Sequence, residues 1–211
     1  MAEAKICGIT TPEALDAALE GRARYVGFVL HAKSPRLLKL EPAQALFERV
    51  QGRAETVAVI ANAPMDRFRV AAQRLSPDWI QAHGHETPDE LEALRPLARK
   101  GVIKAIGLAR AEDLNAVASF AGVAQMFLFD AKAPPGAERA GGHGVAFDWA
   151  ILAGRSFPRP WFLSGGLTPE NVSEAIRTSG AGLVDVSSGV ESAPGLKDPL
   201  RITQFLAATR A

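Results

Sequence analysis

Short runs of β-branched and aromatic residues alternate along the chain with stretches whose apolar residues recur at helical spacing, and glycine, proline, asparagine or aspartate separates them. This order predicts repeated units in which a strand precedes a helix. Dividing the 211 residues among eight units gives about 26 for each, near the short end for a closed eight-unit barrel. The predicted strands are eight short segments: Ala4 to Cys7, Tyr25 to Leu30, Thr56 to Ile60, Trp79 to Ala82, Val102 to Ile106, Gln125 to Phe129, Trp161 to Leu163 and Gly182 to Val186.

Three predicted helices begin at a threonine that is followed by proline and an acidic residue. These threonines are Thr11, Thr87 and Thr168. Each is predicted to be an N-cap, because its hydroxyl can accept a hydrogen bond from the first turn and proline suits the first helical position. Apolar residues at helical spacing follow the first and the last of them and predict faces that pack on the strands: Leu15, Ala18 and Leu19, then Val172, Ala175 and Ile176.

The even spacing of the strands decides the predicted fold class. We predict an α/β protein, a single parallel (β/α)8 TIM barrel that occupies residues 1–211 as one catalytic domain. An open doubly wound sheet is the alternative, since strands that alternate with helices also build that fold. In a barrel of this kind the reacting groups come from the C-terminal ends of the strands and the loops that follow them.

Composition and charge exclude several classes of function. The chain is 47% hydrophobic and 22% charged, and its net charge of +1 provides no basic surface of the kind that drives nucleic-acid binding. No apolar run approaches the roughly 20 residues of a membrane helix, and the first residues lack the pattern of a secretory signal. We therefore expect a cytoplasmic enzyme with no nucleic-acid or membrane partner, as a monomer or a homodimer.

Polar residues stand at the predicted C-terminal ends of six strands: Cys7, Asn62, His83, Asp130, Ser164 and Ser187. Cys7 is the only cysteine, so an intramolecular disulfide and a cysteine-rich metal cluster are both impossible. Taken alone, it fits either a small buried apolar residue or a reactive thiol beside the turn at Gly8. Asp130 ends an apolar strand, where partial desolvation would favour the protonated form of a general acid, but a turn-forming aspartate fits equally well.

Two glycine-containing segments are predicted to bind a phosphate group. They are Ser164, Gly165 and Gly166 after the seventh strand, and Ser187, Ser188 and Gly189 after the eighth. Backbone N–H groups in such turns can converge on an anion, and the loops after strands seven and eight of these barrels often form that site. The eighth strand also places Asp185 below the mouth of the barrel, as supporting structure.

Arg36, in the loop after the second strand, offers a planar guanidinium that suits a carboxylate, although a solvated basic loop explains it as well. His83 and His85 raise the possibility of a metal. We predict none, because Gly84 separates the two histidines on a turn and no third ligand is evident.

Several motifs follow one another along almost the whole chain. The first are K-I-C-G-I-T (5–10), S-P-R (34–36) and Q-A-H-G (81–84). The later ones are L-F-D-A-K (128–132), G-G-H-G (141–144), F-D-W (147–149), L-S-G-G-L-T-P-E-N-V (163–172) and V-D-V-S-S-G-V-E (184–191). Together they resemble the phosphoribosylanthranilate isomerases of tryptophan biosynthesis. The first and the last motif, at opposite ends of the chain, make this resemblance specific.

The resemblance implies an Amadori rearrangement without a cofactor, in which N-(5-phospho-β-D-ribosyl)anthranilate becomes 1-(2-carboxyphenylamino)-1-deoxyribulose 5-phosphate. It implies that Asp130 is the general acid, that Cys7 is the general base, and that Arg36 lies near the anthranilate carboxylate. It also places Gly166, Ser188 and the loop around Gly142 in the phosphate site. His143 stands where this family commonly has a small hydroxyl residue, which leaves open the donors of that loop.

Two other functions remain open on the residues alone. Another isomerase, epimerase or lyase of sugar phosphates could use the same barrel, because phosphate loops do not define a reaction. Such enzymes often use two carboxylates, a metal or a lysine, and Lys104 in the fifth strand has no obvious activating partner in the sequence. A metabolite sensor with an oxidisable Cys7 is the alternative without catalysis.

Overall fold

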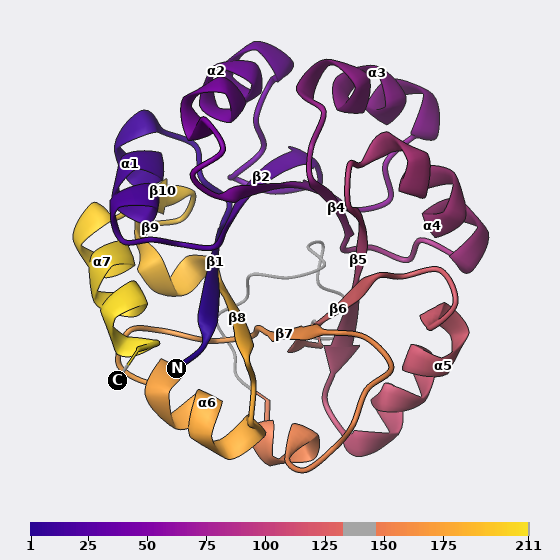
Figure 1. The fold of residues 1–211 in the computed structure, drawn as a ribbon, viewed down its shortest axis with the longest axis vertical. Coiled ribbons are helices and arrows are strands. Elements are labelled where there is room, and N and C mark those ends of the chain that lie inside the picture. The colour runs from indigo at the N-terminus through magenta and orange to yellow at the C-terminus, as the bar shows by residue number, and fades with distance from the viewer. Residues whose placement is uncertain (133–146, 211) are drawn as a thin grey trace.

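Eight parallel strands close into a barrel in the computed structural model, which describes residues 1–132 and 147–210. The strands follow one another around the barrel in sequence order, and β8 pairs with β1 to close it (Figure 1). Their bounds are β1 (Glu3–Cys7), β2 (Tyr25–His31), β3 (Glu55–Ile60), β4 (Trp79–Ala82), β5 (Gly101–Leu108), β6 (Met126–Ala131), β7 (Trp161–Leu163) and β8 (Leu183–Val186). All eight predicted strands and the closed barrel are thus confirmed, and the open doubly wound sheet is wrong.

Helices form a ring around the strands (Figure 1). The α-helices are α1 (Pro12–Glu20), α2 (Leu40–Val50), α3 (Met65–Leu75), α4 (Pro88–Leu94), α5 (Ala116–Phe120), α6 (Val172–Ser179) and α7 (Pro199–Ala208). Short 3₁₀ helices are η1 (Arg95–Leu97), η2 (Ala111–Asn115), η3 (Trp149–Leu152) and η4 (Ser188–Val190). No helix in the described part of the chain is long and apolar enough to cross a membrane.

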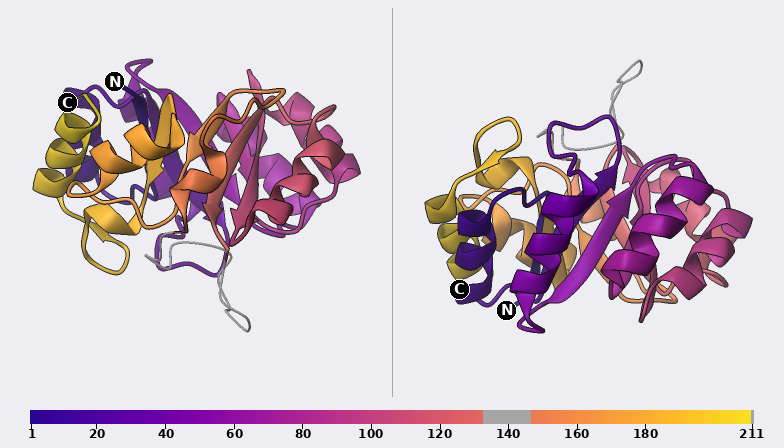
Figure 2. Two further views of the ribbon diagram at one scale, coloured as in Figure 1. Left: turned by 90° about the horizontal axis from the view of Figure 1, so that it is seen from below. Right: turned by 90° about the horizontal axis from the view of Figure 1, so that it is seen from above.

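A small antiparallel hairpin of β9 (Glu191–Ala193) and β10 (Leu196–Lys197) follows β8 and stands outside the barrel wall. Figure 2 shows this hairpin and the loop after β2 at one end of the barrel, while both chain termini lie at the other end. Since only the short helix η4 separates the end of β8 from the hairpin, the end that carries the hairpin is the C-terminal end of the strands, where reacting groups are expected.

The apolar residues divide into two layers because successive strand residues point to opposite faces. One set fills the interior of the barrel and includes an edge-to-face pair of Tyr25 and Phe162, with ring centroids 5.1 Å apart. The larger set lies between the strands and the helices. Side chains thus fill the interior, and only the ends of the barrel are accessible to a substrate.

The predicted N-caps are correct at two of three positions. Thr11 and Thr87 accept hydrogen bonds from the first turns of α1 and α4, and Thr87 also forms a capping box with Glu90. The prediction is wrong at Thr168, because α6 begins four residues later, at Val172. Asn171 explains the delay: its side chain accepts a bond from the Thr168 N–H at 2.8 Å and donates to the Gly166 carbonyl at 2.9 Å, which holds the intervening residues in a turn.

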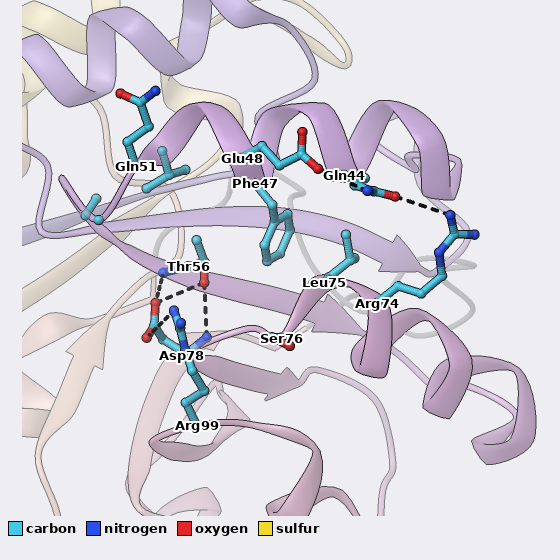
Figure 3. Close-up of a pocket in the computed structure, with 13 residues that line it drawn as sticks. Gln44, Phe47, Glu48, Gln51, Thr56, Arg74, Leu75, Ser76, Asp78 and Arg99 are labelled. Atoms are coloured by element: carbon cyan, nitrogen blue, oxygen red, sulfur yellow. Dashed lines mark hydrogen bonds and ion pairs between the residues drawn. The ribbon is translucent and has the colours of Figure 1, made fainter.

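A surface cavity of about 290 Å³ lies at the opposite end of the barrel from the hairpin, beside α2 and the start of β3 (Figure 3). Asp78 lines it and accepts hydrogen bonds from the backbone N–H of Thr56 at 2.9 Å and from its hydroxyl at 3.0 Å. Arg99 pairs with the other oxygen of Asp78 at 2.9 Å. These contacts tie β3 to the segment before β4, far from the C-terminal strand ends, and therefore serve stability.

Replacing Asp78 with alanine is expected to destabilise the fold without slowing turnover. The substitution leaves the buried Thr56 N–H without its acceptor, which costs about 1–3 kcal/mol. Denaturant unfolding should show this loss in Asp78→Ala, with kcat unchanged. The control Glu92→Ala removes an exposed acid on α4 and should stay within about 0.5 kcal/mol of the wild type. A large fall in kcat for Asp78→Ala at full folding would contradict the assignment.

Candidate active site

Cys7 ends β1 inside the barrel and is 7% exposed. Gly8 follows it with a φ of 77°, so the chain turns away at once and the thiol stays at the C-terminal end of the strand. Gly27 lies opposite Cys7 on β2, and a Cβ at that position would come within 3.1 Å of the Cys7 sulfur. The absence of a side chain at Gly27 therefore makes room for the thiol.

A buried ion pair lies below Cys7. The Lys5 ammonium is 2.7 Å from Asp185 Oδ1, and the Ser164 hydroxyl donates to Asp185 Oδ2 at 3.1 Å. Lys5 is completely buried, and Asp185 is 4% exposed. The pair links β1 to β8 across the closing seam of the barrel and also holds the end of β7. Asp185 thus lies below the mouth, as the strand alternation predicts.

Burial and the Lys5 charge have opposite effects on the Cys7 thiol. Burial raises the pKa of Cys7, Lys5 lowers it, and the net pKa lies above that of a free cysteine. Burial likewise lowers the pKa of Lys5, but the charges and hydrogen bonds of Asp185 and Cys7 together outweigh it and the net pKa is raised, so the ammonium keeps its proton. Without substrate the site therefore contains a protonated thiol beside a permanent cation.

Asp130 lies at the end of β6 and is 8% exposed. Its Oδ1 accepts a bond from the Ala131 N–H at 2.8 Å, and its Oδ2 is 3.2 Å from His83 Nε2. On the other side of the imidazole, Gln81 Nε2 donates to Nδ1 at 2.7 Å. That bond leaves the proton of a neutral His83 on Nε2, directed at Asp130. Gly165 packs so closely that a Cβ there would lie 3.1 Å from Asp130 Oδ1.

The turn that carries His83 rests on a second buried ion pair. Glu86 accepts hydrogen bonds from the backbone N–H groups of Asn62 at 2.6 Å and of Gly84 at 2.8 Å. Lys104 pairs with Glu86 at 3.2 Å and donates to the Gly84 carbonyl at 2.7 Å. The sequence showed no activating partner for Lys104, and the structure adds an ion-pair partner, Glu86, from the loop after β4. Lys104 lies outside the barrel wall, over the ring of Phe120 on α5.

Arg36 is buried and already paired. Its Nε donates to Glu191 Oε1 at 2.6 Å and its Nη2 donates to Glu191 Oε2 at 2.8 Å. A guanidinium has five N–H groups, so this contact leaves two on Nη1 and one on Nη2. These form the outer edge of the fork, which can still bind a carboxylate with two parallel hydrogen bonds. Arg36 is therefore a buried, paired charge and not a solvated surface charge.

The two predicted phosphate loops lie against each other. A Cβ at Gly189 would come within 1.9 Å of the Leu167 carbonyl oxygen, so glycine is required for the contact between the loops. The Ser187 hydroxyl is used within the protein, since it donates to the Cys7 carbonyl at 3.0 Å. Among the described residues, the N–H groups of Gly166, Ser188 and Gly189 have no acceptor. Backbone groups are therefore the donors that these loops can offer an anion.

The structure brings most of the residues predicted for the site to one end of the barrel: Cys7, Arg36, Asp130, Gly165, Gly166, Ser187, Ser188 and Gly189. Gly142 and His143 lie outside the described residues. Within residues 1–132 and 147–210, no group of three or more His, Cys, Asp and Glu side chains could hold a metal ion. Sequence reasoning missed the contact of His83 with Asp130, although the histidine was visible at a strand end.

A closed parallel barrel with a thiol and a carboxyl group at the C-terminal ends of its strands defines a (β/α)8-barrel enzyme. The family model for N-(5'phosphoribosyl)anthranilate (PRA) isomerase matches residues 4–208. The chain belongs to this family. It is an intramolecular aldose–ketose isomerase that converts N-(5'-phosphoribosyl)anthranilate into 1-(2-carboxyphenylamino)-1-deoxyribulose 5-phosphate in tryptophan biosynthesis. The family match decides against the two alternatives, a different sugar-phosphate enzyme and a metabolite sensor.

Individual relatives agree with the family. The chain is 50% identical over 211 residues to N-(5'-phosphoribosyl)anthranilate isomerase of Caulobacter vibrioides. This alignment covers 98% of this chain and 95% of that protein. The crystal structure of phosphoribosyl anthranilate isomerase from Thermotoga maritima superposes with a TM-score of 0.88 at 33% identity, over 100% of this chain and 99% of that one. Another solved isomerase, in complex with reduced 1-(o-carboxyphenylamino)-1-deoxyribulose 5-phosphate, is 30% identical with a TM-score of 0.83, over 100% and 99%.

When no substrate is bound, the thiol of Cys7 should lose its proton at a higher pH than a free cysteine does, because burial raises its pKa. We expect the rate of alkylation by iodoacetamide to rise with pH to a midpoint above that of an unburied cysteine. The same chain in denaturant is the control and should show the ordinary midpoint of about 8.5. A midpoint in the folded protein below that of the denatured chain would contradict the raised pKa.

Proposed function

We propose that Cys7 and Asp130 are the general base and the general acid of the isomerisation. One observation carries this proposal: both side chains are buried at the C-terminal ends of strands on different sides of the barrel, β1 and β6, with β7 and β8 between them along one wall (Figure 1). A substrate across the mouth of the barrel can then meet an acid at one part and a base at another.

Asp130 acts first. Its carboxyl group gives a proton to the ring oxygen of the ribose, and the bond between this oxygen and C1′ breaks. The electron pair of the anthranilate nitrogen forms a C1′=N bond, so the open-chain product is a protonated Schiff base. His83 faces the Asp130 carboxylate with its Nε2–H at 3.2 Å and stabilises the negative charge that proton transfer leaves.

Cys7 completes the shift. Its thiolate takes the proton from C2′, the electrons of this C–H bond form C1′=C2′, and the C1′=N electrons return to nitrogen. The resulting enolamine becomes the ketone when its C2′ hydroxyl loses a proton and C1′ gains one. The raised pKa of Cys7 means that the thiolate is scarce in the empty site. The Lys5 ammonium below it and the cationic Schiff base above it both favour the ionised form.

Two other groups bind the parts of the substrate that do not react. The free edge of the Arg36 guanidinium donates hydrogen bonds to the anthranilate carboxylate, while Glu191 occupies the other edge. The phosphate is bound by backbone N–H groups of Gly166, Ser188 and Gly189, with Gly165 and Ser187 shaping the two loops. The start of the short helix η4 adds to this site, as the phosphate sites of such barrels often use an extra helix after β8.

Removing either proposed proton-transfer group should slow chemistry and leave binding nearly unchanged. Because general acid or base catalysis contributes about 10²- to 10⁴-fold, Cys7→Ala and Asp130→Asn should each lower kcat by at least that order with little change in KM. Steady-state kinetics and the thermal midpoint are measured on the same samples. A Cys7→Ala enzyme with reduced stability and nearly normal kcat would instead identify Cys7 as a packing residue.

Arg36→Ala is expected to weaken binding more than catalysis. The carboxylate contact is made in the ground state and in the transition state, so its loss raises KM more than it lowers kcat. The comparison of KM and kcat with the wild type tests this expectation. An unchanged KM in a folded Arg36→Ala enzyme would remove Arg36 from the substrate site.

Inorganic phosphate should compete with the substrate for the loops after β7 and β8, and Gly166→Asp should abolish this competition, because a carboxylate in the site repels an anion. Gly166 has a φ of 65°, so any side chain there adds strain. Gly166→Asn is the matched control, since asparagine tolerates this conformation and has the same shape without the charge. Equal inhibition by phosphate in the aspartate and asparagine variants would place the phosphate site elsewhere.

A further inference from the structure

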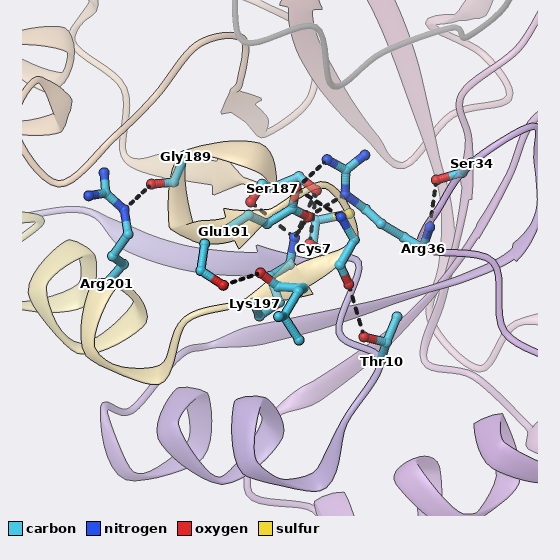
Figure 4. A network of polar contacts seen from close by, with 12 residues as sticks. Cys7, Thr10, Ser34, Arg36, Ser187, Gly189, Glu191, Lys197 and Arg201 are labelled. Carbon is cyan, nitrogen blue, oxygen red and sulfur yellow. Dashed lines mark hydrogen bonds and ion pairs between the residues drawn. The ribbon is translucent and has the colours of Figure 1, made fainter.

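Three buried charged groups outside the proposed proton-transfer pair form one cluster beside the mouth of the barrel (Figure 4). Glu191 lies between Arg36 and Lys197: both N–H groups of one Arg36 edge bind it at 2.6 and 2.8 Å, and Lys197 Nζ is 2.6 Å from its Oε1. Lys197 is 4% exposed and Arg36 is 6% exposed. Glu191 and Lys197 both come from the β9–β10 hairpin, which the eight-stranded barrel itself does not require.

The cluster has two cations and one carboxylate. Burial alone would raise the pKa of Glu191, but the hydrogen bonds and charges of Arg36 and Lys197 outweigh burial and lower it, so the carboxylate stays ionised. Burial lowers the pKa of Lys197 against the attraction of Glu191. With all three groups charged, one positive charge is uncompensated in a desolvated place, and a buried charge of this kind is stabilised by an anionic partner.

The guanidinium of Arg36 has little freedom to turn. Its aliphatic stem crosses Gly8, where a Cβ would lie 2.5 Å from Arg36 Cδ. The Arg36 backbone N–H donates to the Ser34 hydroxyl at 3.1 Å. A fork held at the stem and along one edge directs its other edge in a single direction, so the binding geometry is set before the ligand arrives.

The turn of the hairpin is fastened to the same region. Gly195 has a φ of 85°, and a Cβ at this position would lie 2.8 Å from the Pro35 carbonyl oxygen. The Gly195 carbonyl accepts a bond from the Thr10 hydroxyl at 3.2 Å, and the Gly195 N–H donates to Glu191 Oε2 at 3.3 Å. The hairpin is thus bound to the loop after β1 and to the loop after β2.

Lys197 extends the cluster to the loop after β8. It donates to the Ser187 carbonyl at 3.0 Å and contacts the Ser187 hydroxyl at 3.2 Å, and this hydroxyl in turn donates to the Cys7 carbonyl. One continuous set of contacts therefore joins the end of β1, the loop that holds Arg36 and the first residue of the predicted phosphate loop.

We propose that Glu191 and Lys197 of the β9–β10 hairpin are positioning residues that fix the Arg36 guanidinium and leave a net positive charge, so that its free edge selects a substrate with an aromatic carboxylate. This rests on the proposed contact of Arg36 with the anthranilate carboxylate. Glu191 does not touch the substrate and acts only through Arg36. Lys197 acts through Glu191 and, by its contacts with Ser187, holds the pair of Arg36 and Glu191 in place relative to the loop after β8.

The test uses two substrates: phosphoribosylanthranilate, and phosphoribosylaniline, which lacks the carboxylate. Because charge-assisted bidentate contacts are among the strong ones, Glu191→Gln should raise KM for the anthranilate substrate about tenfold, with kcat changed less than about threefold. It should leave kcat/KM for the aniline substrate at the wild-type value. The matched control is Glu170→Gln, which breaks an exposed pair with Arg201 at 3.3 Å and should change neither substrate.

The same substitution in an Arg36→Ala background isolates the coupling. If Glu191 acts through Arg36, Glu191→Gln should add less than about twofold to KM in that background, because coupled residues are not additive. Equal effects of Glu191→Gln on both substrates, or a full effect in the absence of Arg36, would overturn the proposal. If Arg36→Ala instead lowers kcat/KM equally for both substrates, the proposed contact of Arg36 with the carboxylate is wrong. Failure of that contact is thus distinguished from failure of the positioning role of Glu191.

A variant with a poorly folded hairpin is recognised by its thermal midpoint. In that case the same kinetic comparison is made with Lys197→Met. This variant leaves the bidentate contact between Glu191 and Arg36 in place and removes one positive charge. The proposal predicts a smaller increase of KM that is again confined to the anthranilate substrate. A loss that is equal for both substrates in Lys197→Met would overturn it.

Discussion

The ion pair of Lys5 and Asp185 is the contact on which the rest of the site depends. It lies inside the barrel at the seam where β1 meets β8, with 2.7 Å between the charged atoms and Lys5 fully buried. Desolvation of two charges is expensive, so such a pair adds little to stability by itself, whereas loss of one partner costs about 3–5 kcal/mol. Its evident effect is electrostatic: it keeps a cation below Cys7 without leaving that charge unbalanced.

Each side chain with a proposed role is held by charged or polar residues from a different part of the chain. Asp185 receives a bond from Ser164 at the end of β7 and so fixes the start of one proposed phosphate loop. Glu86 and Lys104 hold the turn that directs His83 towards Asp130. The barrel strands supply the places of these groups, while the loops and buried ion pairs supply their orientation. This division explains how one fold can serve many reactions.

The sequence was sufficient for the fold because its signals are local. Strand runs such as Met126 to Phe129 and the caps at Thr11 and Thr87 depend on neighbouring residues, and the structure confirms them. The predicted N-cap at Thr168 was wrong because the side chain of Asn171 competes for the same turn. Spacing alone did not distinguish a cap from a turn that merely precedes the helix.

Contacts between residues distant in the chain explain what the sequence did not predict. Arg36 and Glu191 are separated by 155 positions, and Lys5 and Asp185 by 180. Neither pairing follows from local composition, and an arginine in a loop looks the same whether it is solvated or buried. His83 was visible at a strand end, but its contact with Asp130 requires the closed barrel that brings β4 and β6 to one mouth.

The pH dependence of kcat/KM tests the role of Cys7 most directly, because the ascending limb reports the loss of a proton from the base of the free enzyme. The measurement compares the wild type with Lys5→Met/Asp185→Asn, a double variant that removes both charges together and leaves neither unpaired. Lys5 lowers the pKa of Cys7 more than Asp185 raises it. The ascending limb should therefore move to higher pH in the double variant. A limb at the same or lower pH in the folded variant would contradict Cys7 as the base.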